Sequence, residues 1–348
     1  MIRADLLREI ASRPVRMSYW FMLAAFVLIG VLQLTTPLLA VLFAYLALAK
    51  LGSIKKGGKW LAVGLFIILL AAANYGLGYL VKNTAHALPQ IAEKAVPSII
   101  HFARSHNIEL PFTDYDSLKD LLLTTAREPA TYLGDFARLA RGAAKQLTFL
   151  AAGCVIAIGL YLNPRLELNR DQHAIRNNWY SVSCDAIAER FRLFYRSFAV
   201  VMGAQILISA INTVLTAVFI LAVHLPNAAL VLGLTFVCGL LPVIGNLISN
   251  AIIVGIGFTV SPRMALMALA FLILIHKLEY FLNGKIIGHR IRNPVWLTLL
   301  ALLVGEKLMG VPGMILAPVV LHYIKVEASS IEVIEDEGLE APLEALKR

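Results

Sequence analysis

The chain has 348 residues, of which 59% are hydrophobic and only 15% are charged, and its mean hydropathy is +0.75. A water-soluble core cannot bury so much apolar surface, so the composition excludes an ordinary soluble domain and indicates a polytopic membrane protein. The formal net charge is +9, but the Lys and Arg residues cluster at the ends of apolar segments. This placement is typical of topology signals and argues against nucleic-acid binding.

Four uncharged segments are long enough to cross a bilayer. A helix needs about 20 residues to span roughly 30 Å of hydrocarbon. Helices are expected throughout, because a β-barrel would show short alternating strands instead. The segments are 17–49, 60–81, 146–164 and 197–262.

The first region, 1–81, is predicted to contain a cytoplasmic segment and three transmembrane helices. Four arginines precede the first apolar segment, which places the N-terminus in the cytoplasm. Pro37 removes a backbone donor and disfavours helix at Thr36, so a hairpin of two helices is expected there. The loop 50–59 has four lysines and no acidic residue, which predicts the cytoplasmic side. The third helix, 60–81, then crosses outward.

The region 82–145 differs in character, because eight Lys or Arg residues balance seven Asp or Glu residues. We expect short amphipathic helices outside the cytoplasm, on the membrane surface or against neighbouring subunits. Asp116 is expected to cap one of these helices. Four prolines are predicted to divide the pieces: Pro89, Pro97, Pro111 and Pro129.

The region 146–196 is predicted to hold a fourth transmembrane helix and a cytoplasmic connector. The connector contains six arginines and four acidic residues in an amphipathic helical pattern. A fifth helix is expected to cross outward from about Ser197 to Val223. The acidic tail, 327–348, is predicted to be cytoplasmic.

Between the fifth helix and the tail, two topologies differ in where they place the basic loop 284–293. The first topology has eight simple spans, with the loop outside. In the second, two segments are re-entrant helical hairpins of opposite orientation, broken at "GLLPVIGN" and "GEKLMGVPG", and the loop is cytoplasmic. The segments concerned are 228–260 and 294–325, and both topologies include a full span over 264–283.

The hairpin topology is favoured by the positive-inside rule, since it brings the basic loop to the cytoplasm. A straight helix over 228–260 would also be roughly 50 Å long, far more than a bilayer requires. Paired Gly/Pro breaks entering from opposite sides are the arrangement by which transporters build a site near the midplane. The predicted fold is therefore an all-α membrane protein with six full spans and two re-entrant hairpins, and 197–326 is its core transport region.

Several motifs of the C-terminal half form one pattern: a Pro and Gly break, a helix bearing a glutamate, a basic loop ending in proline, and a glycine series followed by Ala-Pro. The pattern resembles that of the bacterial autoinducer-2 exporter family of permeases, also called PerM-like. Asn246, Gly284 and Glu306 depart from it. The matching positions are Pro242, Gly245, Glu279, Pro294, Gly305, Gly310, Gly313, Ala317 and Pro318.

The resemblance implies a bacterial inner-membrane, multi-pass protein with both termini in the cytoplasm. Members of the family are associated with export of small signalling molecules or with cation/proton exchange. The resemblance also implies a homo-oligomer, and in known cases a pentamer.

A polar stripe runs along the otherwise apolar helix after the first break. His276, Glu279 and Asn283 stand at i, i+3 and i+7. An ionisable residue at membrane depth suggests a transport site or proton relay, although Glu279 could instead pair with Lys277. Glu306 becomes a cation or proton site if the second hairpin enters deeply, and is solvated if that hairpin is shallow.

A second polar face follows the first break, where Asn246, Ser249 and Asn250 share one side of a helix. These residues could bind substrate hydroxyls or hydrogen-bond to another helix. The glycines and prolines are expected to set backbone geometry. The candidates for the transport path are Pro242, Gly245, Asn246, Asn250, His276, Glu279, Asn283, Gly305, Glu306, Gly310, Gly313 and Pro318.

Enzyme motifs are absent from the sequence: it contains no HExxH, no GxSxG and no P-loop. We therefore predict no catalytic residue, metal site or cofactor. The expected partners are the lipid bilayer, a small molecule or ion, and further copies of the chain. The leading hypothesis is a permease that moves a small solute out of the cell, with H⁺ or Na⁺ as the coupling ion. A passive channel and a non-transporting membrane scaffold are the alternatives.

Overall fold

The computed structural model consists of α-helices, and within the residues it describes there is no strand. The all-α class predicted from the sequence is therefore confirmed for that part of the chain. The described ranges are 2–54, 58–125, 132–164, 178–241, 244–287 and 294–330. Their helices are α1 (Ile2–Val31), α2 (Thr35–Ile54), α3 (Lys59–Ser105), α4 (Tyr115–Thr125), α5 (Tyr132–Leu162), α6 (Trp179–Val223), α7 (Ala228–Gly239), α8 (Ile244–Val260), α9 (Pro262–Ile287) and α10 (Val295–Ser329).

Six of these helices contain stretches long and apolar enough to cross a membrane. The number equals the six predicted spans, but the set differs: it includes 296–329 and not the predicted span 264–283. The structure describes the side chains of α9 only as far as Leu278. The six stretches are 13–31, 35–53, 59–105, 145–162, 179–223 and 296–329.

The first apolar segment is divided near Pro37 into two helices, as predicted, but α1 packs mainly on α6 and α2 mainly on α5 rather than on each other. The turn lies at residues 32–34, and Gln33 adopts a left-handed backbone with φ of 54°. Pro37 itself falls in the first turn of α2, where its missing N–H removes no intrahelical hydrogen bond. The proline thus helps to begin α2.

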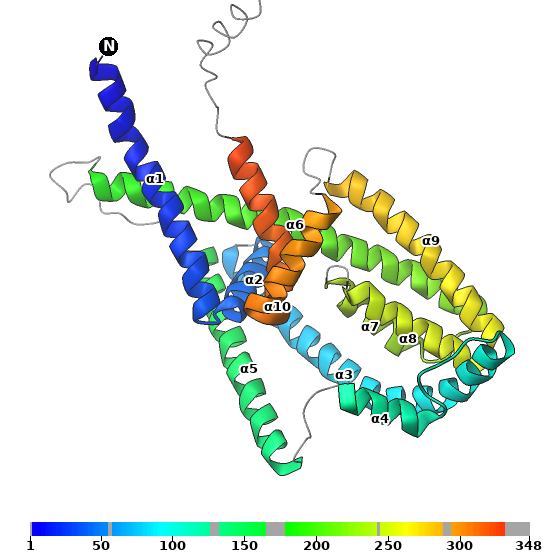
Figure 1. The fold of residues 1–348 in the computed structure, drawn as a ribbon. Helices are drawn as coiled ribbons and strands as arrows, with labels where there is room; N and C mark the ends of the chain where they lie inside the picture. Colours follow the sequence, from blue (N-terminus) through cyan, green and yellow to red (C-terminus); the bar gives the residue numbers. More distant parts are fainter. Residues whose placement is uncertain are drawn as a thin grey trace, which may run out of the picture.

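The N-terminal half packs around α6 and the last helix. Phe198 and Val319 are fully buried in this core, together with Met202. Phe26 from α1 meets Phe194 from α6 edge-to-face, with ring centroids 5.1 Å apart. Such aromatic pairs contribute specific geometry beyond their buried area. They connect α1, α6 and α10, and Figure 1 shows α6 crossing both α1 and α10.

The prediction that prolines divide 82–145 into short helices is wrong for its first part. α3 is 47 residues long and continues through Pro89 and Pro97. Both prolines lie on its exposed face, whereas Ile91 and Val96 are buried on the inner face. Packing of the inner face against α8 offsets the hydrogen bonds that each proline removes from the helix. The second half of α3 therefore covers the α7–α8 pair, as Figure 1 shows.

The cap predicted at Asp116 is also displaced. α4 begins at Tyr115, and Asp114 is the residue whose carboxylate accepts a hydrogen bond from the Ser117 backbone N–H at 2.7 Å. This hydrogen bond lowers the pKa of the Asp114 carboxyl below its usual value, since it favours the charged form. Ser117 Oγ in turn accepts from the backbone N–H groups of Thr113 and Asp114.

The predicted cytoplasmic connector and fifth span are one helix from Trp179 onward. α6 has 45 residues and begins at Asn178, whose side chain accepts a hydrogen bond from the Ser181 N–H at 2.9 Å. Because this helix is so long, it can contact α1 and α10 along its first half and α7 and α9 along its second half. α6 thus supports both predicted hairpins.

The predicted break near residue 242 is present. α7 ends at Gly239 and α8 begins at Ile244, and the two short helices pack against each other. A Cβ at Gly245 would overlap the carbonyl oxygen of Cys238, so only glycine permits this close return. Residues 242 and 243, and so the predicted Pro242, lie outside the described residues. A single unbroken helix over 228–260, as in the eight-span alternative, is not observed.

The last helix also reverses within its length. Gly310 has φ of 64° and ψ of −152°, a conformation that in practice requires glycine. A Cβ at Gly305 would lie 2.6 Å from the Gly313 carbonyl oxygen, although eight residues separate the two along the chain. The two halves of α10 therefore fold against each other, and Leu302 packs on Met314 (Figure 1).

Candidate functional site

The broken end of α7 is stabilised by polar side chains of α6. A helix terminus leaves backbone carbonyls without intrahelical partners, which is unfavourable in an apolar environment. Gln205 Nε2 donates a hydrogen bond to the Gly239 carbonyl oxygen at 2.5 Å, and Ser209 Oγ donates to that of Phe236 at 2.7 Å. The carbonyl groups at the break are thus bonded to α6 rather than exposed to lipid.

A cluster of polar side chains continues from this point into the protein. Its members surround a cavity about the size of one water molecule, formed where α6, α7, α8 and α9 meet. Asn212, Thr216, Thr235 and Ser249 are buried in it. We call this group the polar cluster; it comprises Asn212, Thr216, Thr235, Ser249, Asn250 and His276.

The polar cluster joins the two polar faces that were noted in the sequence. Asn250 Nδ2 of α8 lies 2.9 Å from His276 Nε2 of α9. The amide nitrogen can only donate, so His276 Nε2 is the acceptor in this arrangement. Protonation of His276 would remove that acceptor and break the bond unless the Asn250 amide turned over.

The hydroxyl group of Thr235, on α7, is available for further hydrogen bonds. The side chain is buried, and its Oγ1 has no hydrogen-bond partner among the described residues. A buried hydroxyl without a partner is unfavourable, so such atoms normally bond to water or a ligand. Thr235 can therefore donate to, or accept from, a molecule in the cluster's cavity.

The predicted candidates are distributed unevenly around this cluster. The structure brings together Asn250 and His276, and it places Gly245 at the break beside them. Their neighbours from α6 and α7 were missed, because polar residues scattered in long apolar helices do not reveal their partners in sequence. Outside the described residues lie Pro242 and the side chains of Asn246, Glu279 and Asn283.

The candidates of the second hairpin lie elsewhere. Gly305, Gly310 and Gly313 shape the reversal of α10, and Glu306 is exposed near its tip. Pro318 lies within the second half of α10. This half packs on α6 around Phe194, Phe198 and Met202, well before the part of α6 that lines the polar cluster. The structure thus does not bring the two groups of candidates into one cavity.

A buried ion pair, which sequence reasoning missed, connects the second hairpin to two other helices. Arg190 of α6 pairs with Glu327 near the end of α10, and both side chains are largely buried. Tyr19 Oη of α1 donates to Glu327 Oε1 at 2.9 Å, and the Arg190 guanidinium lies 4.9 Å from the Tyr19 ring centre. Glu327, which the sequence predicts to belong to the acidic tail, lies in α10.

The described residues contain no group of three His, Cys, Asp or Glu side chains placed to hold a metal ion. The polar cluster offers amide, hydroxyl and imidazole groups. Its chemistry is therefore suited to hydrogen bonding and proton exchange.

The long apolar helices define the class of the protein: a helical multi-pass membrane protein, here with a polar cluster at a broken helix. The chain belongs to the AI-2E family of transporters, since the profile of the AI-2E family transporters matches residues 17–331. It is also 30% identical over 125 residues to a Bacillus subtilis (strain 168) protein named "Putative transport protein YdbI". That match covers 35% of this chain and 36% of the relative.

Proposed function

We propose that this transporter moves a small, neutral, hydrogen-bonding solute out of the cell through the polar cluster. The observation that carries the proposal is the cluster itself, which places Thr235 with an unpartnered hydroxyl beside the break between α7 and α8. Among the described residues, no Asp, Glu, Lys or Arg lines it. Hydroxyl and amide groups suit a hydroxylated solute better than an ion of high charge.

Proton coupling through His276 fits the described side chains better than Na⁺ coupling. An imidazole can take up and release a proton, and a proton on Nε2 of His276 would disturb its bond to Asn250. That bond joins α8 to α9, so a proton would loosen one side of the first hairpin. The proton and the solute would then both act on the hairpin formed by α7 and α8.

The proposed topology keeps both hairpins re-entrant and both termini in the cytoplasm of a bacterial inner membrane. α7 has 12 residues and is roughly 18 Å long, too short for about 30 Å of hydrocarbon. The topology predicts that a cysteine introduced at Gly288, which lies outside the described residues, is labelled from the cytoplasm. Labelling from the outside alone would contradict it.

We also propose that the chain assembles into a homo-oligomer. The family resemblance implies a pentamer. Large apolar side chains are exposed along the outer faces of the described helices, including Trp20, Trp60 and Trp296. The lipid bilayer and neighbouring copies would cover them. Cross-linking of the protein in native membranes measures the copy number directly.

The proposal is tested by solute flux in proteoliposomes, with ribose and glycerol as hydroxylated probes and an internal pH dye. We expect that a pH gradient drives the flux uphill and that Thr235→Val and Asn250→Ala each reduce it at least about tenfold. The matched control is Thr213→Val, because within the described part of the chain the Thr213 hydroxyl bonds to the Ser209 carbonyl of its own helix, α6.

Two outcomes would contradict the proposal. Flux that no gradient can drive uphill would indicate a passive channel. Absence of flux for either probe from a folded wild-type protein, combined with specific capture of partner proteins through 82–145, would indicate a membrane scaffold.

A further inference from the structure

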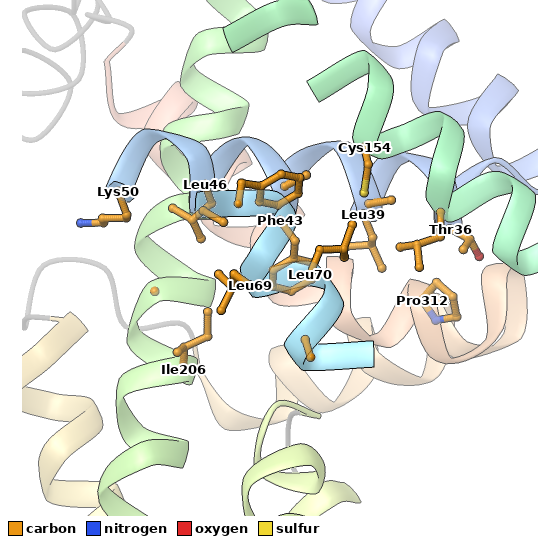
Figure 2. Close-up of a pocket in the computed structure, with 17 residues that line it drawn as sticks. Thr36, Leu39, Phe43, Leu46, Lys50, Leu69, Leu70, Cys154, Ile206 and Pro312 are labelled. Carbon is orange, nitrogen blue, oxygen red and sulfur yellow. The ribbon is translucent and has the colours of Figure 1, made fainter. Parts of the chain in front are cut away.

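A second cavity lies among α2, α3, α5 and α6 and shares no lining residue with the polar cluster. Its volume is about 620 Å³, and it is open along part of its surface. Sites for small molecules occupy roughly 300–1,000 Å³. The walls are almost wholly apolar, with Leu39, Phe43 and Leu70 among them (Figure 2). The cavity is open because several of its lining residues have small side chains or none: Ala40, Ala44, Ala47, Ala73 and Gly203.

One end of this cavity carries a positive charge. Lys50 is the only charged residue of α2, and its side chain is exposed and extends beyond the end of the cavity (Figure 2). Thr36 and Pro312 line the opposite end. Lys50 forms no salt bridge within the described part of the chain. The cavity therefore has an apolar body with an ammonium group at its mouth.

The dimensions and the charge match one leaflet of a bilayer. The rise along α2 from Thr36 to Lys50 is roughly 21 Å at 1.5 Å per residue, somewhat more than half of a hydrocarbon core of about 30 Å. The loop 50–59 has four lysines and no acidic residue, which places this end at the cytoplasmic surface. Anionic lipids are concentrated in that leaflet.

We infer that this cavity binds one acyl chain of an anionic phospholipid, whose phosphate is held by the ammonium group of Lys50. A volume of about 620 Å³ and a charged mouth suit an acyl chain that carries an anionic headgroup. An acyl chain gains little by moving from the bilayer into another apolar space. The headgroup charge therefore sets the preference among lipids, by roughly fivefold for one lysine at the surface.

The inference concerns lipid binding and does not depend on the proposed transport function. It is tested by native mass spectrometry of the full-length protein, purified and then mixed with equal amounts of phosphatidylglycerol and phosphatidylcholine of identical acyl chains. We expect the wild type to retain one lipid per protomer at this site and to prefer phosphatidylglycerol roughly fivefold. Lys50→Gln should abolish the preference and Lys50→Arg should keep it, while Lys82→Gln serves as the charge control.

A second pair of variants tests the cavity itself. Ala73 lines the cavity, whereas Ala72 beside it on α3 does not, and both are exposed, so neither substitution overpacks a buried core. Ala73→Phe should reduce retention of both lipids, and Ala72→Phe should leave it unchanged. An unchanged preference in Lys50→Gln, full retention in Ala73→Phe, or a wild type that retains no lipid would each overturn the inference.

Discussion

The two helical hairpins begin from the same sequence device, a Gly/Pro break in an apolar segment, but are stabilised differently. At the first break, side chains from α6 supply hydrogen bonds to the carbonyls of α7. At the second, Gly310 provides the reversal and two glycines allow the backbones to touch. The first hairpin is thus stabilised by polar side chains, whereas the second depends on glycines, whose lack of a side chain allows the backbone to reverse and pack closely. The same Gly/Pro signal in sequence can therefore produce either a polar break or a purely backbone reversal, depending on which helices pack around it.

The largest effect is expected from breaking the ion pair that anchors the second hairpin. Glu327→Leu leaves Arg190 buried without its partner, which costs about 3–5 kcal/mol when a charge is fully buried. The double variant Arg190→Met with Glu327→Leu should recover most of that loss. Thermal unfolding of the detergent-solubilised protein measures both. Equal stability of the single and double variants would show that the pair does not anchor α10.

A smaller effect should follow from filling the space between the two halves of α10. A Cβ at Gly313 would overlap the Gly305 carbonyl oxygen, so Gly313→Val should destabilise the protein by about 1–3 kcal/mol. Gly159→Val is the control, because no atom lies within 4 Å of its Cβ position. Unfolding midpoints compare the two variants. If both behave alike, the tight return at Gly310 is not required for stability.

At the first hairpin, loss of a hydrogen bond should matter more than loss of volume. Gln205→Leu leaves the Gly239 carbonyl without that partner and should cost about 1–3 kcal/mol. Gln205→Glu keeps the size but places a carboxylate, which can only accept, against the Gly239 carbonyl oxygen, so it should destabilise the break at least as much as Gln205→Leu. Hydrogen exchange of α7 reports the loosening of the break. Wild-type exchange in both variants would contradict this account of the hairpin.

The smallest effect is expected far from either hairpin, at the start of α4. The pKa of Asp114 is lowered in the folded protein, so its charged cap is present above the unfolded value and is lost as the pH falls through the folded value. Protection of the Ser117 amide should therefore be constant from pH 7 to 5 and should fall below the usual pKa of 3.8. In Asp114→Ala the protection should be low at every pH. Hydrogen exchange at that amide gives the measurement.

The breaks could be predicted from sequence because glycine and proline are local signals. The predicted interruption at 239–246 lies between Gly239 and Ile244, and the predicted tip at 305–313 contains the reversal at Gly310. The re-entrant insertion of either hairpin into a membrane stays a prediction.

Features that depend on distant contacts could not be predicted. α3 continues through Pro89 because its opposite face packs on α8. That contact lies far away in the sequence, so rules based on neighbouring residues cannot predict it. Thr235 looks like an ordinary polar residue in an apolar helix until α6 and α8 surround it. Glu327 was grouped by charge with the acidic tail, whereas its partner is on α6.

The most direct test of the central claim asks whether the polar cluster contacts the transported solute. Thr235→Cys is introduced after the three native cysteines are replaced, and a small thiol reagent is added to proteoliposomes during ribose flux. We expect that modification at this position stops the flux and that ribose slows the modification, whereas Val304→Cys on the second hairpin shows neither effect. Continued flux with a fully modified Thr235→Cys variant would contradict it.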